Sequence, residues 1–127
     1  MSASAKACCE SQPPLFTSHE QWRQALSAAL DDGVYLAHYP VLTPEGELLH
    51  HECPSRLRLL GHWRGPSLFM PWVRRLALHA RLDLAVVTQA LREIDRDGLP
   101  RGIHLSLEGI SDSHLIGQLQ RLLSTHA

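Results

Sequence analysis

The feature that most constrains the fold is a pair of long β-rich runs joined by a short turn and followed by helical segments. The runs cover Val34–Leu42 and Leu48–Leu59, and the Thr43–Glu47 segment between them contains a Pro and a Gly. Two such runs separated by a Gly-containing turn predict a β-hairpin. Because the chain past the hairpin alternates helices with a strand, the pattern favours an α/β fold with a parallel sheet or barrel.

Helices are predicted on both sides of this hairpin. Ser18, followed three residues later by Gln21, is a helix-start signal of the capping-box type, and apolar residues then recur at helical spacing until Asp31-Asp32-Gly33. Residues 61–66 have the composition of a loop. The remaining predicted elements are helices at Leu68–His79 and Leu82–Asp97, a strand at Ile103–Leu107, and a last helix capped by Ser111 or Asp112 and continuing to Leu123.

The predicted strands are too few to close a barrel. A closed α/β barrel has eight strands and typically about 250 residues, whereas this chain has 127. We therefore expect a flexible tail or linker at residues 1–14 and a partial, half-barrel domain at 15–127. Its open edges would recruit a protein partner or, most simply, a two-fold homodimer that covers apolar side chains of Leu36, Val41, Leu57, Leu105 and Leu107.

Composition excludes several classes of protein. Twelve Lys and Arg nearly match thirteen Asp and Glu and are scattered along the chain, so nothing predicts binding of a nucleic acid polymer. Cys8, Cys9 and Cys53 are odd in number and form no CxxC pair, which favours a reducing, cytoplasmic location. The chain contains no long apolar run, so it predicts neither a signal peptide nor a membrane span.

Several short motifs occur in the order and spacing of one known family. Tyr39-Pro40-Val41 stands where that family has Gln-Pro-Ile/Val, and Glu52-Cys53-Pro54-Ser55-Arg56-Leu57 stands where it has Glu-Ala-Leu-Leu-Arg. The segments that follow are Phe69-Met70-Pro71-Trp72, Ala80-Arg81-Leu82-Asp83 and Ile103-His104-Leu105-Ser106-Leu107, the last in the place of Val-Asn-Leu-Ser. Together they resemble the N-terminal half of the EAL domain, the cyclic-di-GMP phosphodiesterase module, over about residues 18–127. The chain most resembles degenerate LapD-type receptors, which bind cyclic di-GMP without cleaving it.

The resemblance implies that this chain lacks most of a phosphodiesterase centre. Metal-assisted phosphodiester hydrolysis needs oxygen ligands that hold divalent cations. Glu52 matches the family's first metal ligand, Ser106 is taken as the place of the second, an Asn, and the remaining ligands belong to the second half of the barrel. We therefore expect no hydrolysis, no cofactor and no bound metal, and a regulatory or protein-interaction role in cyclic-di-GMP signalling. The alternatives are a cyclic-di-GMP receptor and a fragment of an active phosphodiesterase.

The resemblance also implies a set of ligand-binding positions. Arg56 matches an arginine that approaches a ligand phosphate, a role suited to the guanidinium fork. Tyr39 replaces the usual Gln, and Pro54 replaces the signature Leu. Since proline removes a backbone donor, we expect strand pairing to bend or end at Pro54. The expected ligand-binding set is Tyr39, Glu52, Pro54, Arg56 and Ser106.

Plainer interpretations of the same residues remain open. Glu52 can be a surface carboxylate paired with Arg56 or Arg58, and Arg56 can be a solvated surface residue. Within His50-His51-Glu52-Cys53, strand alternation puts His50 and Glu52 on one face and His51 and Cys53 on the other, so neither face has three metal ligands. No motif supports Cys53 or Ser106 as a nucleophile.

Overall fold

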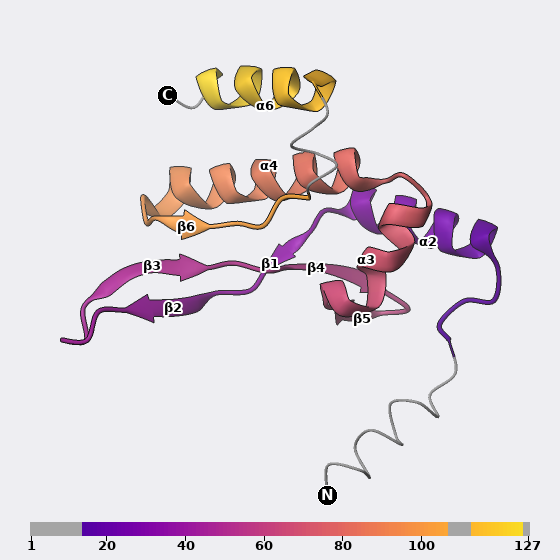
Figure 1. Cartoon of the computed structure of the whole chain (residues 1–127), viewed down its shortest axis with the longest axis horizontal. Coiled ribbons are helices and arrows are strands. Elements are labelled where there is room, and N and C mark those ends of the chain that lie inside the picture. The colour runs from indigo at the N-terminus through magenta and orange to yellow at the C-terminus, as the bar shows by residue number, and fades with distance from the viewer. Residues whose placement is uncertain (1–13, 107–112, 126–127) are drawn as a thin grey trace, which may run out of the picture.

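The computed structural model describes residues 14–106 and 113–125, which form a mixed α/β arrangement. Figure 1 shows the long helix α4 (His79–Asp97) lying across two small sheets, with α6 (Ser113–Thr125) on its other side. Helices α2 (His19–Asp32) and α3 (Pro66–Arg75) lie at the opposite end from the hairpin tip. Residues 1–13 of the expected tail, Leu107, and the expected helix caps Ser111 and Asp112 lie outside the described residues. No helix in the described part of the chain is long and apolar enough to cross a membrane.

The first helix, α2 (His19–Asp32), begins where its cap is predicted. The hydroxyl of Ser18 accepts a hydrogen bond from the backbone N–H of Gln21 at 3.1 Å. The Gln21 side chain accepts from the backbone N–H of Thr17 at 2.7 Å, one residue earlier than a capping box requires. The helix ends at Gly33, whose φ of 101° only glycine adopts without strain.

The predicted hairpin is confirmed, but it is divided into two paired segments. Strand β2 (Tyr39–Leu42) pairs antiparallel with β3 (Leu48–Glu52), and β1 (Tyr35–Leu36) pairs antiparallel with β4 (Ser55–Leu59). The second run is interrupted between β3 and β4, at Pro54, as the missing backbone donor of proline predicts.

Residues 61–66 were expected to form a loop, and this expectation is wrong. His62–Arg64 form a further strand, β5, which pairs antiparallel with β4. The turn between them is made by Leu60 and Gly61, with φ values of 51° and 79°. Two consecutive positive φ angles are typical of the tight type I′ hairpin turn, which usually contains Asn or Gly. Leucine at the first turn position hides this signal in the sequence.

The two central helices are confirmed with shifted boundaries. Helix α3 covers Pro66–Arg75, with proline in its first turn, and α4 covers His79–Asp97. The first of these ends four residues before its expected end at His79. Helix α4 ends at Gly98, which adopts the left-handed conformation common at helix C-termini.

The last strand begins two residues earlier than expected. Strand β6 is Arg101–Gly102, and residues 103–106 of the predicted strand are not extended in a ladder. Strand β6 pairs parallel with β3, placing Gly102 opposite Glu52. The strand orders are β1-β4-β5 and β2-β3-β6, so the described strands form two small sheets instead of one continuous half barrel. The final helix, α6, covers Ser113–Thr125.

One core fills the space between the helices and the inner face of the sheets. It contains Trp22, Leu26, Phe69, Val73 and Val86, and a smaller cluster joins α4 to α6. Leu36 and Leu57 belong to the main core and are buried, so the expectation that they form part of an exposed apolar face is wrong. Alternation puts them on the helix-covered side of the sheet. Val41 and Leu105 are partly exposed.

Candidate functional site

The five expected ligand-binding residues fall into two neighbouring groups. Tyr39 and Arg56 lie on the outer face of the hairpin, and Pro54 and Ser106 line a pocket beside α3 and α4. Glu52 is the register partner of Tyr39 at the end of β3.

Glu52 is held by two imidazoles instead of an arginine. Its Oε1 accepts a hydrogen bond from Nε2 of His50 at 2.7 Å, and its Oε2 lies 3.4 Å from Nε2 of His104. The His50 contact confirms that alternate residues of this strand share a face. The hydrogen bond from His50 is the main reason that the pKa of the Glu52 carboxyl is below its ordinary value. Neither Arg56 nor Arg58 is its ion-pair partner among the described contacts.

Ser106 is directed to a different carboxylate. Its hydroxyl donates to Oδ2 of Asp83 at 2.6 Å, and its backbone N–H donates to the same side chain. Asp83 is only 2% exposed, so these bonds satisfy a buried carboxylate. The residue brought to Glu52 is instead His104. A position-by-position comparison of Ile103-His104-Leu105-Ser106 with Val-Asn-Leu-Ser identifies His104 as the match to the family Asn.

Close packing of β6 against β3 brings His104 to this position. A Cβ atom on Gly102 would lie 3.0 Å from Oε1 of Glu52, which is closer than carbon and oxygen normally approach. Glycine therefore leaves room for the carboxylate beside the parallel strand.

Strand β6 is fixed to α4 by a buried polar network centred on Glu93 and Arg101. The Arg101 guanidinium donates to Glu93 at 3.2 Å and to both carboxylate oxygens of Asp97. Glu93 also accepts from His38 at 2.7 Å and from Gln89 at 3.1 Å. The side chains of Arg101 and Glu93 are only 4% and 6% exposed. Sequence patterns did not indicate this network, because its members come from α4, β6 and the segment between β1 and β2.

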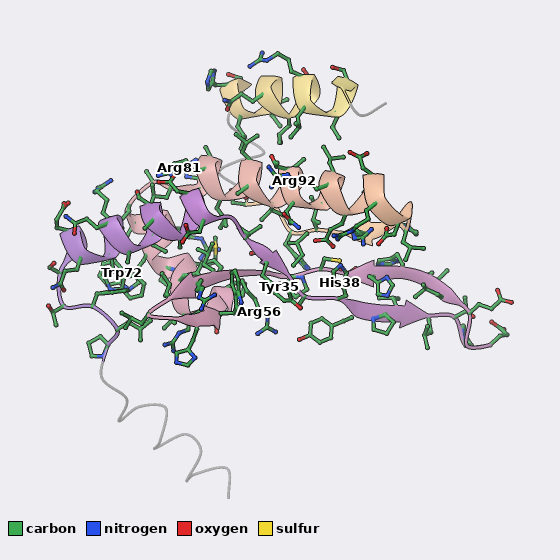
Figure 2. All side chains as sticks on the ribbon, turned by 180° about the vertical axis from the view of Figure 1, so that it is seen from behind. Tyr35, His38, Arg56, Trp72, Arg81 and Arg92 are labelled. Atoms are coloured by element: carbon green, nitrogen blue, oxygen red, sulfur yellow. The ribbon has the colours of Figure 1, made fainter. Side chains whose placement is uncertain are left out.

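The outer hairpin face combines aromatic rings with guanidinium groups. The Arg56 side chain donates to the Tyr39 hydroxyl at 3.0 Å, and the ring of Tyr35 lies 5.6 Å from that of Trp63. Arg58 lies over Trp63, with its guanidinium carbon 5.9 Å from the ring centre. Figure 2 shows Tyr35 and Arg56 on the side of the sheet away from α4. Tyr35, Tyr39, Arg56 and Trp63 line a shallow pocket of 560 Å³.

The second pocket has a volume of 370 Å³ and lies between the start of α3, the start of α4 and the segment after β6. Its polar lining includes Ser55, Arg74, Asp83 and His104, and its apolar lining includes Met70. Guanidinium, hydroxyl and carboxylate groups surrounding an apolar floor can hold a heterocycle by hydrogen bonds and packing.

The described residues do not fit the divalent metal centre that the resemblance implies. No group of three or more His, Cys, Asp or Glu side chains in residues 14–106 and 113–125 is arranged to hold a metal ion. Both oxygens of Glu52 contact imidazoles, whereas Mg²⁺ prefers oxygen ligands. Burial raises the pKa of the Cys53 thiol, the opposite of what a reactive thiolate needs.

Comparison with known proteins gives a clear result only for structure. No protein-family model and no curated protein matches the chain. Vibrio cholerae LapD (S helix-GGDEF-EAL, apo) matches with a TM-score of 0.79 at 19% identity over 91% of this chain. The Xanthomonas citri FimX EAL domain in complex with c-di-GMP matches with a TM-score of 0.71 at 26% identity over 85% of this chain. The c-di-GMP complex of the PaMucR phosphodiesterase matches with a TM-score of 0.62 at 23% identity over 84%.

This chain spans only part of those proteins, 29% of the LapD structure and 45% of the FimX domain. The matches include LapD and the PaMucR phosphodiesterase, so the likeness shows the fold alone.

Proposed function

We propose that this chain, which has the fold of part of an EAL domain, is a non-catalytic regulatory or protein-interaction module of c-di-GMP signalling. The observation that carries this proposal is the contact of both Glu52 oxygens with His50 and His104. We further propose a cytoplasmic location, because Cys53 is a free thiol.

The chemistry of these contacts opposes metal-dependent hydrolysis. Hard cations such as Mg²⁺ are bound by carboxylate, amide and water oxygens. The His104 imidazole stands where the family has an amide, and an imidazole nitrogen suits softer transition metals better. A Mg²⁺ ion bound to Glu52 would compete with His50 and His104 for the carboxylate oxygens.

Open strand edges among the described residues support an interaction role. We propose that the described sheets correspond to the first half of a barrel, and that a protein partner or a second copy covers the remaining strand edges. Strand β6 is an edge of its sheet among the described strands. Exposed side chains of Leu42, Leu48 and Leu49 on the hairpin add apolar surface for such a partner.

A second candidate function is that of a c-di-GMP receptor, and the outer hairpin face favours it. Arg56 and Arg58 can pair with phosphate oxygens, while the Tyr35 and Trp63 rings can stack on a guanine base. The 560 Å³ pocket places the Tyr39 hydroxyl within the same surface.

One set of experiments separates these functions. Purified chain incubated with c-di-GMP and Mn²⁺ should yield no linear dinucleotide. Turnover that disappears in Glu52→Ala would overturn the non-catalytic proposal. Calorimetric titration with c-di-GMP tests the receptor. If the receptor exists, Arg56→Ala should weaken binding by roughly ten- to a hundredfold, the effect of losing one charge-assisted contact.

Arg96→Ala, an exposed arginine on α4, is the matched control and should bind like the parent. Equal affinity of Arg56→Ala and the parent would remove the receptor hypothesis and leave the interaction role.

A further inference from the structure

Two adjoining pockets form a groove across α4, away from the hairpin face. The first, of 310 Å³, lies between the end of α2 and α4, and the second, of 410 Å³, lies between α4 and α6. They share Leu84 and Thr88, so their linings are continuous. Figure 2 shows Arg81 and Arg92 along α4 on the side near α6, whereas Arg56 lies beyond the sheet.

The floor of the groove is formed by one face of α4. Arg81, Ala85, Thr88 and Arg92 follow each other at spacings of three or four residues, which places them in one row on a helix. The small side chains of Ala85 and Thr88 at the middle of the row permit close approach of another chain. Leu84 and Leu122 add partly buried apolar surface beside them.

The lining of the groove has three arginines, Arg81, Arg92 and Arg121, and two aspartates, Asp31 and Asp32, so it has an excess of positive charge. Arg92 on α4 and Arg121 on α6 are exposed, and neither forms an ion pair with a carboxylate in the part of the chain that the structure describes. Arg81, by contrast, pairs with Asp31 at 2.8 Å. An occupant that brings carboxylates to Arg92 and Arg121 would therefore gain two charge-assisted contacts.

We propose that this groove binds an acidic, amphipathic segment of a protein partner. Its apolar side chains would lie on Leu84, Ala85 and Leu122, and its carboxylates would face Arg92 and Arg121. A second copy of this chain is the alternative occupant, and the sedimentation experiment below distinguishes it. The inference rests on the proposed interaction role, but its surface is separate from the Tyr39 and Arg56 face.

The test uses the whole chain and a defined probe. The probe is a fluorescein-labelled amphipathic peptide of about 16 residues with leucines on one face and glutamates on the other. Fluorescence anisotropy should report saturable binding, and a peptide with lysines in place of the glutamates should not bind. Arg92→Glu and Arg121→Glu should each weaken binding at least roughly tenfold, because attraction becomes repulsion. Thr88→Trp, which fills the floor, should abolish it.

Arg58→Glu is the matched control, since it makes the same charge change on the hairpin face. It should leave peptide affinity within about twofold of the parent, and circular dichroism checks that every variant is folded. Three results would overturn the proposal: equal binding of both peptides, unchanged binding by folded Arg92→Glu, or absence of saturable binding. Sedimentation that shows a dimer lost in Thr88→Trp would assign the groove to a second copy instead. Binding to anionic vesicles without binding to the peptide would assign it to a membrane surface.

The peptide result and the c-di-GMP titration are independent measurements. Hydrolysis of c-di-GMP by a chain that binds the acidic peptide would contradict the non-catalytic proposal while leaving the groove in place. A catalytically silent chain that fails to bind the peptide would remove the groove alone.

Discussion

Replacing Arg101 with methionine should destabilise the fold strongly, because Arg101 joins β6 to α4 from inside the protein. Its side chain is 4% exposed and contacts Glu93, which is 6% exposed. The substitution would leave the Glu93 carboxylate buried with only His38 and Gln89 as partners. Removing one member of a buried charged pair typically costs about 3–5 kcal/mol. That is a large share of the roughly 5–15 kcal/mol by which a domain of this size is stable.

Urea unfolding followed by circular dichroism measures the loss, as a lower midpoint at unchanged slope. Arg101→Lys keeps the charge but cannot reach Glu93 and Asp97 with one planar fork, so its stability should lie between the parent and the methionine variant. If Arg101→Met does not fold, Arg101→Lys still gives a measurable midpoint. Arg96→Met, an exposed arginine of α4, is the control and should change stability by no more than about 0.5 kcal/mol. A free energy of unfolding for both Arg101 variants equal to that of the parent would refute the assigned role.

Three further predictions concern Asp97, Gly102 and Leu60. The Arg101 hydrogen bonds hold the pKa of the Asp97 carboxyl well below its ordinary value. Asp97 therefore stabilises the fold at pH values above its pKa in the unfolded chain, about 4, and this stabilisation is lost as the pH falls below that value. The acid limb of a stability-against-pH curve should therefore be shallower in Asp97→Asn, and an unchanged limb would contradict this. Gly102→Ala should displace the Glu52 carboxylate, visible as a shifted His50 imidazole signal in NMR spectra without unfolding. Leu60→Asn should raise the free energy of unfolding by several tenths of a kcal/mol, seen as a higher urea midpoint, since Leu60 is 60% exposed at a positive φ; a lower midpoint would argue against the turn.

The parts of the fold that follow from local rules were predictable from sequence. The Ser18 cap, the turn before Leu48 and the Gly98 terminus each depend on a few adjacent residues, and all are found near their predicted positions. Strand β5 was not predictable, because its turn places Leu60 at a positive φ, and leucine is not a residue that indicates such a turn. The bulk of Leu60 is tolerated there because the side chain is exposed and meets solvent.

The candidate site depends on where β6 pairs with β3, and the motif comparison that chose Ser106 was displaced by two residues. Alternating apolar and polar residues at 103–107 indicate a strand, but pairing with β3 is set by Arg101 and its buried partners on α4. That contact moves the paired strand two residues towards the N-terminus, and the chain leaves the ladder after Gly102. His104 then reaches Glu52, and Ser106 meets the buried Asp83. The short motif, compared residue by residue, is sufficient to assign His104 to the carboxylate, whereas the boundary of β6 accompanies long-range contacts of Arg101 that no short motif contains.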